Sequence, residues 1–512
     1  MLRGILTVGG WTMASRILGF VRDVLIADLL GAGPVADAFF VANRLPNLFR
    51  RLFGEGAFNA AFVPEFAGSL AAEGPAVARG FAEEAMALMA AWLAGLAILG
   101  ELFMPAVVLV LAPGFHADAA KFALAVTLSR ITFPYMPLIC LTALLSGVLN
   151  GLDRFAAAAA APILFNLTTI AFLLALAGFL PTPGHALAWG VTVSGVLQLG
   201  LLLHAVRKAG MGLALRRPRL SPRMRLLLAR MAPGLFGAGV TQLNLTVDLI
   251  IASLLPSGTV SVLYYADRVN QLPLGVIGAA VGTALLPTLS RAVRGGETAA
   301  AMAAQNRGIE YALSLTLPAA IGLLMVGHAV IAVLFGRGAF DPRAALRAGQ
   351  ALSAYAVGLP AFVLVKALVP GFFARGDTAT PVKIGTATVA LNLVLNFAFM
   401  VPLQHLGPPL ASGVAAWANV ASLTLVLRRR GHFAIDARLA RVVPRMLLAA
   451  LAMAVALGAI DRLVYAPLAG QGVLRWLGLA ALIGGGMLVY AAAGQLLGAF
   501  DAAALLRRRR GG

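Results

Sequence analysis

Long apolar stretches limit what this chain can fold into more than any other feature of the sequence. Residues 81–111 and 309–334 form two such stretches. Each exceeds the roughly 20 apolar residues that a helix needs to cross about 30 Å of hydrocarbon. They lack the period-two alternation of a membrane strand, and a helix satisfies its own backbone polar groups in lipid. The sequence therefore predicts membrane-spanning helices and excludes a membrane β-barrel.

Proline, glycine and charged residues divide the remaining sequence into about fourteen spans. The predicted spans are 5–30, 36–68, 81–111, 121–149, 157–180, 185–206, 226–255, 261–290, 306–334, 345–373, 382–402, 408–427, 442–460 and 473–497. Only 12% of the 512 residues are charged, whereas a soluble domain carries about 25%. We therefore expect an all-α integral membrane protein.

Basic residues are distributed unequally between the loops. The chain has 40 Lys and Arg against 20 Asp and Glu, which gives a net charge of +20. If both termini are cytoplasmic, about 26 of the basic residues lie on the cytoplasmic side and about six on the other. This asymmetry predicts cytoplasmic termini and an even number of spans. It also explains the net charge without a nucleic-acid partner.

The chain resembles itself at an offset of about 224 residues. Phe39-Phe40 in the second span correspond to Tyr264-Tyr265 in the eighth, and Pro137 corresponds to Pro360. Six helices per repeat predict two parallel lobes around a central cavity, with the substrate at their interface. The expected domains are an N-terminal lobe at 1–210, a C-terminal lobe at 211–435 and two additional helices with a basic tail at 436–512.

Charged residues inside spans are concentrated in the first, second and eighth of them. Each costs about 2.5–3.5 kcal/mol at mid-bilayer on insertion scales, so such residues line water or pair internally. The set is Arg16, Arg22, Asp23, Asp37, Arg44, Arg50, Arg51, Glu55, Asp267 and Arg268. On an ideal helix Ser15, Gly19 and Arg22 share one stripe.

Two interpretations of these charges remain open. In the first they form structural pairs between neighbouring helices, namely Arg22–Asp23, Asp37–Arg44, Arg51–Glu55 and Asp267–Arg268. In the second the excess of arginine binds an anion, because unpaired cations are costly in a low dielectric. Guanidinium groups bind phosphate oxygens in a bidentate fashion, which favours a phosphate or pyrophosphate cargo.

The sequence contains no Walker glycine loop and no Cys/His cluster, so it predicts neither ATP-driven transport nor metal chemistry. No cofactor is expected, and the driving force is expected to be the membrane potential, an ion gradient or both. Asp248 is the candidate ligand of a monovalent cation, although a hydrogen bond between helices explains it equally well.

Four motifs resemble the MurJ (MviN) family of the MOP exporter superfamily. They are SRILGFVRD at 15–23, ADAFFVANRLPNLFRRLFGEGAFNAAFVPEF at 36–66, YYADRVNQLPLGV at 264–276 and PGFFARGDTATPVKI at 370–384. The resemblance covers essentially the whole chain. It implies a transporter, not an enzyme, that flips lipid II across the bacterial inner membrane by alternating access for peptidoglycan synthesis.

The resemblance also implies roles for individual residues. Arg16, Arg22, Arg50 and Arg268 would line the cationic cavity, with Arg22 and Arg268 nearest the pyrophosphate. Asp37 and Glu55 would gate the cavity or pair with those arginines. Asp23 and Asp267 are expected to pair with the arginines next to them in the sequence. Ideal helical phasing places Arg51 on the charged face, whereas the resemblance selects Arg50. The implied partners are lipid II and membrane lipids, and other cell-wall synthesis proteins are compatible with it.

Three other functions are alternatives to lipid II flipping. A multidrug antiporter of the same superfamily would have an excess of acid in its cavity, and this chain has an excess of arginine. A flippase for another polyprenyl-pyrophosphate-linked oligosaccharide would look the same at the phosphate. A membrane-embedded transferase would need a clustered carboxylate or metal motif, and the sequence shows none.

Overall fold

The protein is all-α in the computed structural model, which describes residues 2–51 and 57–500. Helices make up 86% of it, and no strand occurs among the described residues. Ten helical stretches in that part of the chain are long and apolar enough to cross a membrane. The predicted fold class is therefore confirmed, whereas the count of fourteen spans remains a prediction.

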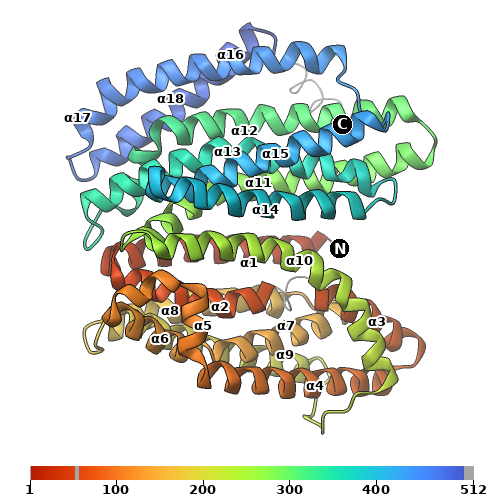
Figure 1. Ribbon diagram of the computed structural model, residues 1–512. Coiled ribbons are helices and arrows are strands. Elements are labelled where there is room, and N and C mark those ends of the chain that lie inside the picture. Colours follow the sequence, from red (N-terminus) through yellow and green to blue (C-terminus); the bar gives the residue numbers. More distant parts are fainter. Residues whose placement is uncertain (1, 52–56, 501–512) are drawn as a thin grey trace. The chain divides into compact units, whose positions relative to one another are not determined.

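Inter-residue contacts divide the chain into two compact units. The residues of each unit can be found in Figure 1 from the colours, which follow the sequence. Unit 1 contains Met1–Ser261 and Gly338–Phe340, and unit 2 contains Val262–Arg337 and Asp341–Gly512. By contacts, α10 therefore belongs to unit 1. The predicted lobes at 1–210 and 211–435 follow the sequence repeat rather than the contacts, and they remain a prediction.

The helices of unit 1 are α1 (Leu2–Leu30), α2 (Pro34–Phe49), α3 (Ala57–Ala72), α4 (Pro75–Leu102), α5 (Met104–Leu111), η2 (Pro113–Ala117), α6 (Ala119–Thr132), α7 (Tyr135–Gly151), α8 (Ala156–Leu176), α9 (Pro183–Lys208) and α10 (Pro222–Leu254). The helix α11 (Thr259–Arg294) begins in unit 1 and continues in unit 2.

The remaining helices of unit 2 are α12 (Thr298–Phe335), α13 (Pro342–Phe373), α14 (Ala379–Leu403), η3 (Gln404–Leu406), α15 (Gly407–Arg429), α16 (Ala437–Ile460), η4 (Asp461–Tyr465), α17 (Ala466–Leu468) and α18 (Leu474–Leu496). The helices α16 and α18 pack side by side in this unit.

Two predicted spans consist of two helices each. The range 81–111 contains α4 and α5, and 121–149 contains α6 and α7, whereas in 36–68 the helices α2 and α3 flank residues outside the described part of the chain. Pro105 lies in the first turn of α5, and Pro134 is the residue before α7. A helix breaks readily at such positions because proline has no N–H to donate.

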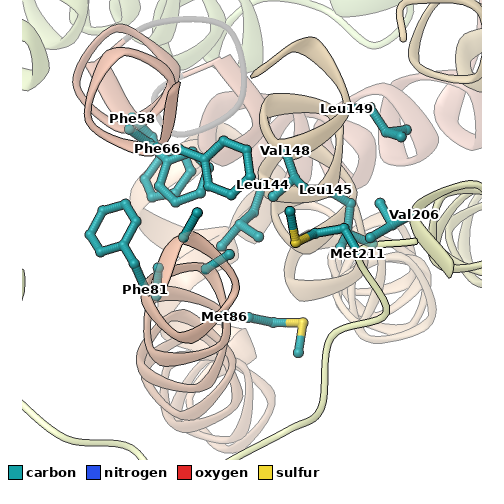
Figure 2. Packing of buried hydrophobic residues seen from close by; sticks show 14 of the residues in the cluster. Phe58, Phe66, Phe81, Met86, Leu144, Leu145, Val148, Leu149, Val206 and Met211 are labelled. Carbon is teal, nitrogen blue, oxygen red and sulfur yellow. The ribbon is translucent and has the colours of Figure 1, made fainter. Parts of the chain in front are cut away.

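Aromatic and aliphatic residues from neighbouring helices form one buried cluster in the core of unit 1 (Figure 2). Phe62 of α3 stacks with Phe58, Phe66 and Phe81 at centroid distances of 5.0–5.7 Å. Leu144 and its neighbours on α7 pack against this group. Because lipid is as apolar as these side chains, close packing rather than exclusion from water holds the helices together here.

The internal repeat recurs in the turns that end α7 and α13. Asp153 and Gly376 both have positive φ, at 57° and 75°. The N–H of Arg154 donates to the carbonyl of Leu149, and about 223 positions further the N–H of Asp377 donates to the carbonyl of Phe372. Both halves of the sequence therefore end the same repeat helix with the same left-handed turn.

Candidate functional site

Arg22 and Asp23 on α1 form a buried ion pair. Arg22 Nη2 lies 2.7 Å from Asp23 Oδ1, and Nε lies 3.2 Å from the same oxygen. Nη1 donates to Asn166 Oδ1 on α8 at 3.0 Å. The side chains are 9% and 4% exposed. The structure thus contains the Arg22–Asp23 pair expected under the structural interpretation.

Asn166 on α8 contacts all three residues of the predicted stripe on α1. Its Nδ2 donates to the carbonyl of Ser15 at 3.0 Å, and a Cβ on Gly19 would lie 3.6 Å from its amide. Ser15, Gly19 and Arg22 therefore share a face as predicted from 100° per residue. That face packs against α8, and Arg22, of which 7% of the whole residue is exposed, pairs internally rather than lining water.

The contacts of Arg22 do not use all of its N–H bonds. A guanidinium group carries five N–H bonds, and three contacts with Asp23 and Asn166 are made here. Phe165 covers one face of the group, with its centroid 5.1 Å from Cζ. Such a fixed and partly neutralised arginine can offer its remaining N–H bonds to an anion.

Asp37 pairs with a lysine, which corrects the expectation of an arginine partner. Lys121 Nζ on α6 lies 2.7 Å from Asp37 Oδ2. The backbone N–H of Gly258 donates to Oδ2 at 2.7 Å, and Ser261 donates to Oδ1 through its N–H and its hydroxyl at 2.8 and 2.7 Å. Asp37 is fully buried. Its carboxylate thus caps the N-terminus of α11, where the helix dipole favours negative charge.

Arg16 and Arg50, the other predicted site arginines of unit 1, are less enclosed. Arg16 is exposed on α1, and Arg50 is half-buried directly after α2, with Nε donating to Asn47 Oδ1 at 3.2 Å. Residues 50 and 51 adopt a π-helical turn. A π turn is wider than an α turn, so phasing at 100° per residue fails there. Glu55 lies outside the described residues.

Arg268 and Asp267 lie on α11 in unit 2. Arg268 is half-buried, and its Cζ lies 5.4 Å from the ring centroid of Tyr264. Asp267 Oδ2 accepts a hydrogen bond from Gln271 Nε2 at 2.6 Å. The structure thus places Arg16, Arg22 and Arg50 in one unit and Arg268 in the other. A shared cavity for the four arginines remains a prediction.

Asp248 is half-buried on α10. Nearby, the Thr246 hydroxyl donates to the carbonyl of Gln242 at 2.8 Å. Among the described residues no group of three or more His, Cys, Asp and Glu is arranged to hold a metal ion. The assignment of Asp248 to a monovalent cation stays a prediction.

An acidic cluster, missed in the sequence, fixes the segment between α9 and α10. Glu83 of α4 accepts from the N–H of Ala214 at 3.0 Å and pairs with Arg216 at 2.6 Å. Arg223 pairs with Glu73 at 3.0 Å. Hydrogen bonds from Ser69 and Arg223 lower the pKa of Glu73. Arg216 in this segment and Arg223 at the start of α10 therefore have local partners besides their predicted topological role.

The comparisons with known proteins agree with this arrangement. A family model described as "Lipid II flippase MurJ" matches residues 26–469. A Rhizobium meliloti protein named "Probable lipid II flippase MurJ" is 45% identical, covering 96% of this chain and 92% of the relative. "Lipid II flippase MurJ" of Burkholderia cenocepacia is 40% identical, with 85% of each chain covered.

Two solved structures share the fold. One is described as "Lipid II flippase MurJ, inward closed conformation", with a TM-score of 0.78, 24% identity and coverage of 96% of this chain and 98% of that one. The other is an inward-facing multidrug resistance MATE family transporter of the MOP superfamily, with a TM-score of 0.69, 15% identity and coverage of 83% and 97%.

Ten membrane-length apolar helices among the described residues, together with the match to the flippase relatives, define a multi-pass helical membrane transporter, not an enzyme. Within that class the chain belongs to the lipid II flippase MurJ family, whose model matches most of its length. It is therefore a multi-pass protein of the bacterial inner membrane.

Proposed function

We propose that this chain moves lipid II from the inner to the outer leaflet of the bacterial inner membrane by alternating access. Membership of the lipid II flippase family, shown over residues 26–469, is the observation that carries this proposal. The fold supports the mechanism, because related MATE transporters have it in inward-facing and outward-facing conformations, with TM-scores of 0.69 and 0.53. Rocking of two repeats about a central site is the usual route of such transporters.

Arg16, Arg22, Arg50 and Arg268 bind the pyrophosphate in this proposal. Among these arginines, Arg22 gives the proposal the most support. Only 7% of the whole residue is exposed, and Asp23 and Asn166 fix the position of its guanidinium group. A buried guanidinium group whose orientation is fixed loses little entropy when it binds phosphate oxygens. Asp23 and Asp267 partly balance the arginines when the cargo has left, which lowers the cost of the empty state. The polyprenyl tail stays in lipid along α16 and α18.

The membrane potential supplies the driving force in this mechanism. Outward movement of an anion is favoured by about 2.3 kcal/mol per charge per 100 mV when the cell interior is negative. Return of the empty, cationic cavity then moves positive charge inward, which is also downhill. An ion gradient acting through Asp248 is the alternative, and transport in vesicles with and without each gradient distinguishes the two.

Lipid II should bind to the purified chain in preference to undecaprenol, which has the same tail without the pyrophosphate. We expect at least about tenfold tighter binding, because each charge-assisted hydrogen bond to the phosphate contributes about 1.5–3 kcal/mol. The measurement is a titration of the chain in detergent with both lipids. Equal affinity for the two would show that the arginines do not recognise the anion.

Both termini are cytoplasmic in this proposal, because about 26 basic residues then lie inside. Reporter fusions after Leu30, Leu111 and Leu255 should report the periplasm, and fusions after Leu70, Lys208 and Arg430 should report the cytoplasm. A single inverted reporter in this series would contradict the arrangement of fourteen spans.

A further inference from the structure

The helix α12 is kinked beside a cavity in unit 2. Val326 has non-helical angles, with φ of −119° and ψ of 16°. The hydroxyl of Ser353 on α13 donates to the carbonyl of Leu324 at 2.9 Å and to that of Leu323 at 3.3 Å. A side chain that takes over helix carbonyls in this way bends the helix. The proline of α12, Pro318, lies too far before the kink to cause it.

The cavity has a volume of about 510 Å³ and is lined by α12, α13 and the corner between α14 and α15. This size falls within the roughly 300–1,000 Å³ of small-molecule sites. Its lining is mainly apolar, with Leu324 and Leu346 at the wall, 42% and 55% exposed. His328 and Gln350 supply polar groups. The cavity is therefore suited to an amphipathic ligand rather than to a sugar or an ion.

One face of α13 changes from cationic to apolar along its length. Arg343, Arg347, Gln350, Ser353 and Val357 are spaced by three or four residues and so share this face. The fourteen steps from Arg343 to Val357 extend about 21 Å at 1.5 Å per residue. Half of a bilayer with its headgroups measures about 20–22 Å. The stripe thus has the length and the polarity gradient of a single lipid molecule.

The polar groups occupy the levels that a phospholipid requires. Arg343 and Arg347 lie in the first two turns of α13, where the helix dipole adds positive charge. The carboxylate of Asp341 is engaged by the N–H of Ala344 as the helix cap. One turn deeper, Gln350 Oε1 lies 3.1 Å from His405 Nε2. On α12, His328 Nε2 lies 3.4 Å from Asp461 Oδ1.

We propose that this cavity binds an anionic glycerophospholipid, with the phosphate at Arg343 and Arg347, the ester groups near Gln350 and His405, and one acyl chain along Ser353 and Val357. The lipid belongs to the leaflet that meets this end of unit 2, which is the outer one under the proposed topology. The site holds a structural lipid and is separate from the cargo arginines. The bound lipid lies between α12 and α13 at the kink.

Native mass spectrometry of the delipidated full chain tests this site. Titration with phosphatidylglycerol and with zwitterionic phosphatidylcholine should show at least about fivefold tighter binding of the anionic lipid, since each basic residue near a membrane surface attracts anionic lipid. The double variant Arg343→Gln/Arg347→Gln should lose that preference. Arg462→Gln, which removes an exposed arginine of η4, should keep it.

Filling the cavity separates a built site from general lipid adhesion. Leu346→Trp, or Val357→Trp if the first variant folds poorly, should reduce binding of both lipids about tenfold. Ala452→Trp on the exposed face of α16 is the matched control and should have no effect. An unchanged preference in the double arginine variant would overturn the proposal, as would equal effects of the cavity and control tryptophans. Displacement of bound phosphatidylglycerol by lipid II in equal amounts would also overturn it, because the occupant would then be the cargo.

Discussion

Replacing Arg22 or Arg268 with lysine should reduce lipid II translocation at least about tenfold in reconstituted vesicles. Lysine keeps the charge but removes the planar fork that binds two phosphate oxygens at once. Loss of one charge-assisted hydrogen bond, about 1.5–3 kcal/mol, corresponds to roughly a tenfold to hundredfold change. For Arg22 the geometry strengthens this expectation, because Asn166 and Asp23 hold a guanidinium group that a shorter-reaching ammonium group cannot replace.

Arg225→Lys is the matched control for both substitutions. Arg225 is exposed in the first turns of α10, and its replacement should leave translocation unchanged. Thermal unfolding of each variant in detergent separates binding from structure. Wild-type transport in both lysine variants would show that the cavity acts through diffuse charge. Poor stability in both would instead support ion pairs, Arg22–Asp23 among them, whose role is to hold the helices in place.

Hydropathy and the repeat were sufficient to predict the helical architecture. Apolar length alone determines where a helix can cross lipid, and the repeat needs no knowledge of contacts. The left-handed turns at Asp153 and Gly376 show how directly the two halves correspond. The breaks within the predicted spans were harder to place, because Pro46 and Pro162 lie inside continuous helices while Pro105 and Pro134 accompany breaks. Tertiary packing decides whether a helix continues through a proline or breaks beside it.

Partners of the buried charges were predictable only when they were neighbours in sequence. Arg22 and Asp23 are adjacent, and their pair was expected. Lys121 lies 84 residues from Asp37, and Asn166 lies 144 residues from Arg22. No periodicity connects such positions, since the link depends on how helices pack. Lys121 lies three residues after the helix-capping Asp118, at the end of a predicted span. A cation at such a position is the one weak signal that a buried acid could have a partner there.

Replacing Lys121 with methionine should destabilise the full chain by about 3 kcal/mol, because it removes the distant partner of a buried charge. Asp37 would remain buried without its cation, and breaking a buried pair by removing one partner costs about 3–5 kcal/mol. Gly258 and Ser261 still donate to the carboxylate, so we expect the lower end of this range. Methionine has a similar length and keeps the packing against Phe115, whose centroid lies 4.0 Å from Lys121 Nζ.

A denaturant titration of the full chain in detergent micelles measures this loss, and a double-mutant cycle with Asp37→Asn assigns it to the pair. The double variant should be more stable than the sum of the two single effects predicts, because no uncompensated charge remains in it. Lys208→Met, at an exposed lysine near the end of α9, should unfold like the wild type. If Lys121→Met matched that control, the N-terminus of α11 alone would suffice to stabilise Asp37, and the ion pair would contribute nothing measurable.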